Sequence, residues 1–407
     1  MNLFLLANRN ICRTRHRAWV TIGAMGLAGF IMIFYAALLE GLIQTTKTNA
    51  IGMELGEVQV HAHGYRNDPD LYKLIESGDQ LIDQLRTDGY NASGRLFSFG
   101  LAAAGNSSAG VRIRGIDLQG EPTVTRLHRH LQAGSWLTAN DTHGVILGRK
   151  LAKTLGVAIG DEVVILGQAA DGSMANDLFI VKGVLKSVGS GIDQAGFIIT
   201  ARAFRELMAL PGGLHEIVVS RPEPVEPLAQ FTRLLADRMP DYEVMNWRQL
   251  QPVVARIVDL SQSSLIIMLL VTYTAVGILT LNSMLMSVFE RIHEFGVMKA
   301  LGFSPVKVFS LIGLETMLQV SYAAFIAIIT GVPLVIYFET HPIDLSFLMQ
   351  TSSTIAGVAI DPVWHSKLTA GSVFSPILFL YIISALAILY PAMKAAMIRP
   401  LQAIYFK

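Results

Sequence analysis

The chain has 407 residues, with 32 Lys and Arg against 31 Asp and Glu, 52% hydrophobic residues and a mean hydropathy of +0.47. Charged residues make up 15% of it, whereas a soluble globular protein carries about 25%. The deficit indicates a membrane protein, and the net charge of +1 argues against a general nucleic-acid binder, which needs a basic field.

Four stretches of the sequence are apolar and long enough to cross a bilayer, which takes about 20 residues. The first, 18–39, carries no charge and is too long for the apolar core of a cleaved signal peptide, so we expect a retained helix. The chain then divides into a cytoplasmic amphipathic segment (1–17), helix one (18–39), an external domain (40–259), helix two (260–289), a cytoplasmic link (290–307), helix three (308–338), an external loop (339–372), helix four (373–390) and a cytoplasmic tail (391–407).

Basic residues predict the orientation, because Lys and Arg next to membrane helices stay in the cytoplasm. Ten of them lie on one side of the helices, and the short loop on the other side has Lys367 alone. We therefore expect both termini in the cytoplasm and the long domain outside. The single cysteine, Cys12, falls on the cytoplasmic side and leaves the external domain without a disulfide. The ten residues are Arg9, Arg13, Arg15, Arg17, Arg291, Lys299, Lys307, Lys394, Arg399 and Lys407.

The external domain shows two α/β halves around an insert. The insert, Ser98–Thr200, holds short apolar runs bounded by glycine and predicts a small β-subdomain with a hairpin tip at Asp171-Gly172. The halves predict a split ferredoxin-like unit. The predicted fold class is thus a membrane α-helical protein with four transmembrane helices and a large α+β domain between helices one and two. The expected elements of the halves are a strand at 57–61, a helix at 79–86 and a strand at 90–97, then a helix at 201–210, a strand at 216–220, a helix at 227–239 and a strand at 242–245.

Catalytic and metal-binding patterns in this domain are incomplete. His61 and His63 lie two apart on a strand, as do His128 and His130, but neither pair has a third ligand at a suitable spacing. We therefore expect surface histidines. Three further residues, Ser135, Asp141 and His143, crowd one loop without the strand-turn-helix context of a nucleophile. The sequence predicts neither an enzyme nor a metal site.

The link after helix two contains a specific pattern. Its residues Glu290-Arg291-Ile292-His293-Glu294-Phe295-Gly296-Val297-Met298-Lys299-Ala300-Leu301-Gly302 resemble the ERxxExGxxKALG signature of the ABC transporter permease family of MacB, the lipoprotein-releasing Lol permeases and, more distantly, FtsX. The resemblance continues in three other places, namely Arg9-Asn10-Ile11-Cys12-Arg13 with Arg17, Leu147–Val157 with Gly160-Asp161, and Tyr390-Pro391-Ala392-Met393-Lys394-Ala395-Ala396 with Arg399-Pro400-Leu401-Gln402-Ala403.

This resemblance implies what the link does. In that family the link is a coupling helix that sits on an ATPase subunit, and helices one and two continue outward as a stalk, here 40–50 and 247–259. The chain has no Gly-x-x-x-x-Gly-Lys-Ser/Thr run to hold ATP phosphates. We therefore expect a transport subunit that is not itself an enzyme and has no cofactor, with ATP and Mg bound by a separate ABC ATPase. By position, the coupling residues are Glu290, Arg291, Glu294, Gly296, Lys299, Ala300, Leu301 and Gly302.

Polar residues inside the membrane helices need partners. Glu315 lies within helix three, where an ionisable side chain is costly and faces protein or water. We expect it to hydrogen-bond to Asn282 or Ser283 of helix two. A proton relay is the alternative interpretation.

Together these features predict a permease subunit in the inner membrane of a Gram-negative bacterium, multi-pass, with a periplasmic domain. It would pair with a second copy or a related permease and, through mechanotransmission, extract lipoproteins from the membrane lipid toward a periplasmic carrier. Two alternatives stay open: an efflux permease of a MacB-like pump, and an FtsX-like regulator of a cell-wall hydrolase. Contacts with lipid or cargo are expected from Phe30, Phe34, Leu38, Leu265 and Met268.

Overall fold

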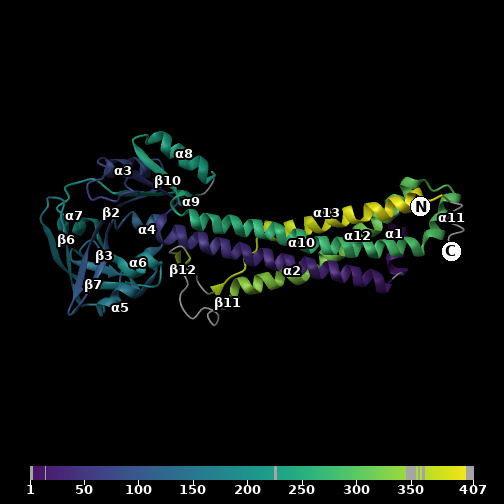
Figure 1. Cartoon of the computed structure of the whole chain (residues 1–407), viewed down its shortest axis with the longest axis horizontal. Helices are drawn as coiled ribbons and strands as arrows, with labels where there is room; N and C mark the ends of the chain where they lie inside the picture. The colour runs from purple at the N-terminus through teal and green to yellow at the C-terminus, as the bar shows by residue number, and fades with distance from the viewer. Residues whose placement is uncertain are drawn as a thin grey trace. The chain divides into compact units, whose positions relative to one another are not determined.

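The structure, a computed structural model, describes residues 3–13, 15–223, 227–344, 354–355, 358–359 and 363–399. Within these residues the chain forms two compact units (Figure 1). The membrane unit comprises the described residues up to 44, from 259 to 344 and from 363 onward. The outer unit comprises those from 45 to 258 and from 354 to 359.

Helices build the membrane unit. Among the residues that the structure describes, four helices are long and apolar enough to cross a membrane, which agrees with the predicted number. Each is longer than its predicted span, because hydropathy marks the apolar part whereas the helical hydrogen bonds continue into polar residues. The helices are α1 (Leu3–Arg13), α2 (Arg15–Ala50), α10 (Pro252–Glu290), α11 (Ile292–Ala300), α12 (Pro305–Thr340) and α13 (Ala370–Met397).

Close side-chain packing joins the long helices. Gly29 lets α2 approach α12, because a Cβ atom there would lie 2.9 Å from the Cβ of Ala327. Helices in a bilayer associate through such contacts, since lipid removes the hydrophobic drive between them. The amphipathic α1 buries Ala7 in a cluster with α12, while Phe4 and Leu5 are exposed. A further cluster contains Met25 of α2, Tyr273 of α10, Val320 of α12 and Leu380 of α13.

The loop and tail predicted at 339–372 and 391–407 are described in part. Residues 345–353, 356–357, 360–362 and 400–407 lie outside the described residues, including Pro400 to Ala403 of the tail pattern. Two short strand pairs belong to the loop: β11 (Ile343–Asp344) with β14 (Val363–Trp364), and β12 (Thr354–Ile355) with β13 (Val358–Ala359).

The outer unit contains the predicted split ferredoxin-like arrangement. Four antiparallel strands follow the order β10-β1-β9-β2, in which β1-α3-β2 and β9-α8-β10 interleave. The ring of Tyr90, after α3, packs on Phe231 of α8 with centroids 5.3 Å apart. The elements are β1 (Val58–Ala62), α3 (Gly78–Thr87), β2 (Asn91–Ala104), β9 (Glu216–Ser220), α8 (Leu228–Arg238) and β10 (Tyr242–Asn246).

The insert closes into a small barrel. Within the described residues β2 pairs with β3, β3 with β8, β8 with β5, β5 with β7, β7 with β6, and β6 again with β2. Closure removes free strand edges, which would otherwise template aggregation. The strands are β3 (Ser107–Ile116), β5 (Gly144–Leu147), β6 (Glu162–Gln168), β7 (Met174–Leu185) and β8 (Gly196–Thr200), with β4 (Leu131–Gly134) paired to β7.

The predicted border between ferredoxin-like unit and insert at Ser98 is wrong. Strand β2 continues to Ala104, because residues 91–95 pair with β9 while 100–103 pair with β6, so one strand serves both parts. Several short elements of the outer unit were also not predicted: β4, α4 (Glu121–Val124), η2 (Leu127–Arg129), α5 (Arg149–Leu155) and α6 (Ser190–Ala195), whereas the helix expected at 201–210 is α7 (Ala201–Leu207).

The two strands that lead into long helices are neighbours. Val58 of β1 pairs with Asn246 of β10, and the Trp247 N–H donates to the carbonyl of Glu57 at 3.0 Å. The chain therefore enters and leaves the sheet at one end of this strand pair. At the exit, Asn246 and Gln249 form a capping box that begins α9 (Trp247–Leu250), directly before α10. At the entrance, α2 ends in the π-helical turn η1 (Ile51–Leu55).

Candidate functional site

The link between α10 and α12 folds as the short helix α11. Helix α10 ends at Glu290, and Arg291 leaves helical geometry, with φ −109° and ψ 14°. After α11, Gly302 adopts a left-handed conformation with φ +95°. Ser304 then caps α12 by accepting a hydrogen bond from the Lys307 N–H. The predicted coupling segment is thus a helix bounded by two turns.

Arg291 anchors the start of α11 to two other helices. Its Nη1 atom lies 3.1 Å from both carboxylate oxygens of Glu315 on α12, and its Nε atom lies 3.2 Å from Oε2 of Glu294. From α1, Asn10 donates to Glu315 at 2.5 Å, and Arg13 lies 2.9 Å from Glu294. We call these five residues the membrane cluster. Each carboxylate in it faces a cation, so charge-assisted hydrogen bonds hold α1, α11 and α12 together.

The partners of Glu315 differ from those that the sequence predicted. Asn282 is exposed, and Ser283 pairs instead with Thr21 of α2, with hydroxyl oxygens 2.8 Å apart. The expectation of a hydrogen-bonded Glu315 holds, but its partners are Asn10 and Arg291. They come from segments outside the spanning helices, which a search for partners inside the membrane overlooks.

Lys299 anchors the other end of α11. Its Nζ atom donates to the carbonyl of Ile398 at 2.8 Å and to the carbonyl of Ala396, at the C-terminal end of α13. The last carbonyls of a helix lack partners and carry partial negative charge, so an ammonium group stabilises them. Burial lowers the pKa of Lys299.

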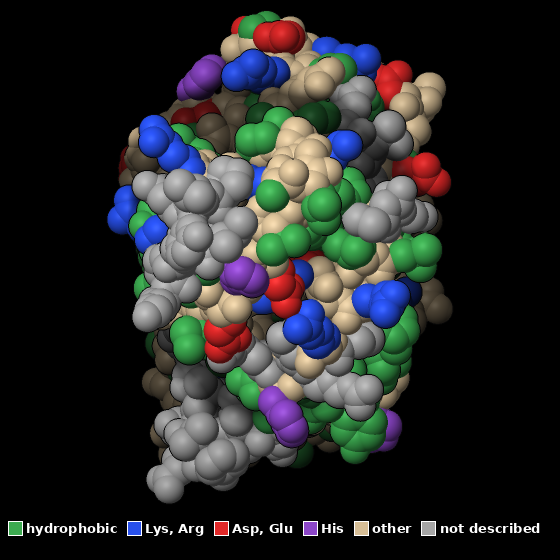
Figure 2. Space-filling view, turned by 90° about the vertical axis from the view of Figure 1, so that its right-hand side faces the viewer, with side chains coloured by type: hydrophobic (Ala, Val, Ile, Leu, Met, Phe, Trp, Pro, Cys, Tyr) green, Lys and Arg blue, Asp and Glu red, His purple; other side chains and the backbone are tan. Residues whose placement is uncertain are grey.

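Helix α11 consequently has an anchored face and an exposed face. On the exposed face, Val297 is 40% and Leu301 81% accessible, and Val306 of α12 adds a third apolar side chain at 71%. Figure 2 views the molecule from the end at which α11 lies, where basic and acidic side chains stand among hydrophobic ones. The predicted coupling residues divide accordingly: Gly296 is buried, Arg291, Glu294 and Lys299 are half-buried in the contacts above, and Glu290, Ala300, Leu301 and Gly302 are exposed.

The predicted lipid or cargo contacts also divide. The ring of Phe34 packs on Phe338 of α12 with centroids 5.5 Å apart, and Leu265 packs against the cluster of the long helices. Phe30 and Leu38 are half-buried, whereas Met268 is exposed. Met268 is therefore the member of this set that is open to a partner or to lipid.

The histidine prediction is correct for His63, which is exposed, and wrong for His61, which is buried. The Nε2 atom of His61 lies 3.1 Å from Oε2 of Glu216. The pairing of β1 with β9 brings these residues together across 155 positions, a contact that no local pattern indicates. His128 and His130 are half-buried, and no group that could hold a metal ion occurs among the described residues.

Comparison with known proteins gives two family matches. Residues 18–237 match the MacB-like periplasmic core domain, and residues 266–400 match the FtsX-like permease C-terminal domain. The first family match alone covers more than half of the chain.

Three curated relatives are similar at low identity. An uncharacterized ABC transporter permease of Methanocaldococcus jannaschii is 19% identical over 283 residues, which are 67% of this chain and 65% of that protein, slightly less than two thirds of its length. The lipoprotein-releasing system transmembrane protein LolE of Haemophilus influenzae is 20% identical over 302 residues, 72% of each chain. LolC of Xylella fastidiosa, from the same kind of system, is 22% identical over 312 residues, 72% of this chain and 73% of that one.

Proposed function

The chain belongs to the ABC transporter permeases that join a MacB-like periplasmic core domain to an FtsX-like permease domain, and we propose that it converts ATP hydrolysis by a separate ATPase into movement of the outer unit. The movement extracts lipoproteins from the inner membrane. ATP and Mg are bound by the ATPase, and a second permease, identical or related, completes the transporter.

The observation that supports binding of the ATPase to α11 is that one face of this helix is anchored and the other is exposed. A helix that transmits force must be held firmly on one side and must present a surface on the other. Arg291 and Lys299 hold α11 to α12 and α13, while Val297 and Leu301 are exposed. Exposed apolar side chains that lie together mark interaction sites. The ATPase binds this face, which includes the predicted coupling residues Ala300 and Leu301.

The likeness to LolE and LolC supports lipoproteins as the cargo, since it extends over 72% of this chain. In this proposal the acyl chains contact the exposed side of α10, where Met268 lies with Ile267 and Val271. Both termini are cytoplasmic and the outer unit is periplasmic. A reporter fused after Lys407 should report the cytoplasm and one inserted at Gly172 the periplasm; the reverse pattern contradicts this orientation.

The first experiment is affinity purification of the tagged chain from native membranes, with and without ATP and vanadate, followed by mass spectrometry. An ABC ATPase together with acylated proteins that leave on turnover supports lipoprotein extraction. An adaptor protein with the ATPase would assign the chain to efflux instead, and a cell-wall hydrolase would assign it to the regulation of that enzyme.

A paired substitution tests the docking face. Leu301→Asp places a charge in the exposed apolar surface and should reduce the co-purified ATPase by about tenfold, since burying an unpaired charge is costly. Ile159→Asp is the matched control, because Ile159 is an exposed apolar residue of the outer unit. Equal recovery of the ATPase from both variants would show that the face does not bind it.

A further inference from the structure

The end of α2 is bonded to the outer unit in an unusual way. The helix runs to Ala50 and closes in the π-helical turn η1, where the Gly56 N–H donates to the carbonyl of Ile51 at 2.8 Å. Such turns are rare and occur as single turns, often at functional positions. The final carbonyls of any helix have no partner within the helix. At η1, which lies within the outer unit, other segments of that unit supply those partners.

Three carbonyls at this turn each accept a hydrogen bond from another segment of the outer unit. The Arg126 N–H donates to Gly52 at 2.6 Å, Nη1 of Arg95 donates to Glu54 at 2.6 Å, and Nε2 of Gln59 donates to Leu55 at 2.8 Å. The side chain of Glu54 accepts a further bond, from Nη2 of Arg114 on β3, at 2.8 Å. The donors come from separate elements, so η1 is held from several directions.

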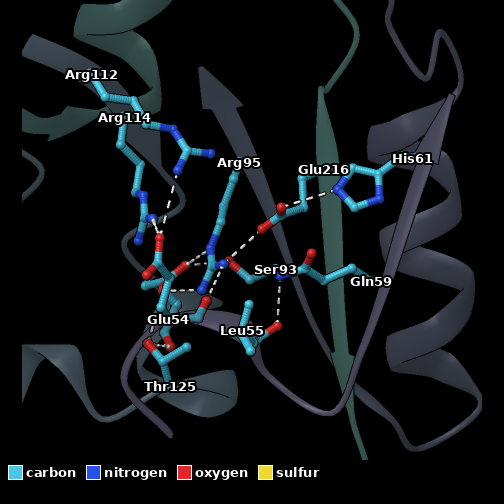
Figure 3. Close-up of polar contacts among 11 residues, drawn as sticks. Glu54, Leu55, Gln59, His61, Ser93, Arg95, Arg112, Arg114, Thr125 and Glu216 are labelled. Atoms are coloured by element: carbon cyan, nitrogen blue, oxygen red, sulfur yellow. Dashed lines mark hydrogen bonds and ion pairs between the residues drawn. The ribbon is translucent and has the colours of Figure 1, made fainter. Parts of the chain in front are cut away.

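Arg95 of β2 is the centre of this arrangement (Figure 3). It forms a bidentate pair with Glu121, at 2.9 Å from Nε to Oε2 and 2.7 Å from Nη2 to Oε1. Its Nη1 atom also donates to Oε1 of Glu216 at 2.7 Å, and the other oxygen of Glu216 contacts His61. We call Arg95, Glu121, Glu216, Glu54 and His61 the outer cluster. One guanidinium thus joins β2, α4 and β9 to the last turn of α2.

The carboxylates of Glu121 and Glu216 stay ionised at neutral pH. Burial on its own raises the pKa of Glu121, but the charge of Arg95 and its hydrogen bonds outweigh this effect, so the pKa lies below its usual value. For Glu216, burial likewise raises the pKa, and the hydrogen bond from His61 and the charge of Arg95 bring it below the usual value. The carboxylates and the guanidinium therefore bind one another at full charge.

Without these bonds the chain would be able to bend at η1. Glycines stand at positions 52 and 56, and glycine adds backbone freedom. Gly56 has φ +68°, and a Cβ there would lie 2.1 Å from Cγ1 of Val218, so no other residue fits. If α2 were pushed or tilted, the chain would bend at η1 before the sheet of the outer unit moved. Arg95 connects the two sides of this point, because its backbone belongs to β2 and its side chain donates to the carbonyl of Glu54.

We propose that Arg95 is a positioning residue that locks η1 to the sheet, so that displacement of α2 moves the outer unit instead of bending the chain at residues 51–56. This role rests on the proposed function for the source of the displacement. Arg95 acts through Glu54, Glu121 and Glu216, and it touches neither ATP nor cargo.

The test compares Arg95→Lys with Arg86→Lys in the full chain in lipid nanodiscs. A lysine at position 95 keeps the charge but cannot bond two carboxylates and a carbonyl in one plane. Arg86 is the matched control, because it also bonds a carboxylate, Asp117, and a backbone carbonyl, that of Ala92, and neither of these partners belongs to η1. We expect Arg95→Lys to speed hydrogen exchange of the Gly56 and Arg126 amides by about tenfold or more and to leave β8 protected.

A distance measurement shows whether the joint has become flexible. Spin labels at Gln44 of α2 and Thr154 of α5, in a Cys12→Ser background, report the spread of distances between helix and barrel. The spread should widen in Arg95→Lys and stay narrow in wild type and Arg86→Lys, both without nucleotide and with the ATPase, ATP and vanadate. If Arg95 stabilised the fold without fixing the joint at η1, Arg95→Lys would leave the spread of distances unchanged.

Each result decides the proposal. Faster exchange confined to η1 with a wider spread supports it. Unchanged exchange at η1, or a uniform increase across the outer unit with a narrow spread, overturns it. The measurements without nucleotide need no ATPase, so they decide the role of Arg95 by themselves. If ATP and vanadate cause no movement in the wild-type complex, that result contradicts the proposed function and leaves the role of Arg95 to the nucleotide-free measurements.

Discussion

The outer cluster and the membrane cluster use the same chemistry in different surroundings. Both centre on an arginine between carboxylates. In the outer cluster, the side chains of Arg95 and Glu121 are each 1% exposed. In the membrane cluster, exposure rises from 8% at Glu315 to 36% at Glu294 and 71% at Arg13. The Arg95–Glu121 pair at the centre of the outer cluster is sealed, although Glu54 at its edge is 34% exposed, whereas the membrane cluster runs from the interior to the surface.

This difference predicts how each network responds to change. A buried ion pair that loses one partner leaves an uncompensated charge, which is strongly destabilising. An exposed pair loses little, because water and salt screen its charges. The outer cluster therefore suits a joint that must not open, whereas the outermost pair of the membrane cluster can separate at low cost. The following predictions test this contrast from its strongest point to its weakest.

Arg95→Met should have the largest effect on stability. It leaves Glu121 and Glu216 buried without their cation, so the outer unit should lose about 3–5 kcal/mol of unfolding free energy. Denaturant unfolding followed by tryptophan fluorescence measures this loss, and Arg86→Met, at a more exposed pair, serves as control. A loss below about 1 kcal/mol would mean that water reaches the cluster and that it is not sealed.

A pH series separates the outer cluster from its neighbour His215. Its Nδ1 accepts from the Phe97 N–H at 3.1 Å, its Nε2 faces the carbonyl of Leu71 at 3.1 Å, and burial lowers the pKa of His215 from 6.5 to about 4. Between pH 4 and pH 6.5 the unfolded chain therefore binds more protons at position 215 than the folded chain does. Stability should be full above pH 6.5 and should fall as the pH drops toward 4, by about 3 kcal/mol.

His215→Gln should flatten this dependence, since an amide does not titrate in the range. Thermal unfolding of both proteins between pH 4 and 8 provides the measurement. The carboxylates of Glu121 and Glu216 should contribute no slope there, because their pKa values are lowered. An equally steep fall in His215→Gln would place the titrating group elsewhere.

Glu315→Gln should have a smaller effect than the loss of Arg95. The amide oxygen can still accept from Asn10 and Arg291, so what is lost is the charge-assisted part of the bonds, about 1–2 kcal/mol. Assembly with the ATPase and transport should persist. Normal assembly with abolished transport would instead favour a protonation role for Glu315, the alternative that the sequence left open.

Arg13→Ala should have the smallest effect. Its ion pair with Glu294 is exposed and worth about 0.5 kcal/mol or less. The difference in melting temperature between variant and wild type should vanish in high salt, because screening removes the pair in both. A large difference that persists in salt would show that Arg13 is buried against a partner in the assembled protein.

Local patterns predicted the regular elements well and the short ones poorly. The bounds of β9 match the predicted strand at 216–220. Strand β4, by contrast, is a four-residue run, Leu-Gln-Ala-Gly, that is too short for its pattern to indicate a strand, and it forms one because β7 lies beside it. Strand β2 was predicted too short, since two different neighbours extend its pairing.

Side-chain environment was predicted less well than backbone. Arg95 fell within a predicted strand, but nothing near it in sequence shows that it is buried. Its partners Glu121 and Glu216 follow 26 and 121 positions later. Likewise, the link pattern marked Arg291, Lys299 and Leu301 together, although Leu301 is exposed and the other two are bonded inward.

The sequence by itself determined the number of membrane helices, the α+β character of the outer unit and the position of the link, because each depends on residues that are close in the chain: apolar runs, alternation or a compact motif. Tertiary structure alone decided which charges are sealed, which face of α11 is open and how the end of α2 is held. Those properties depend on which distant side chains meet, since a charge is stabilised inside a protein only by partners that the fold brings to it.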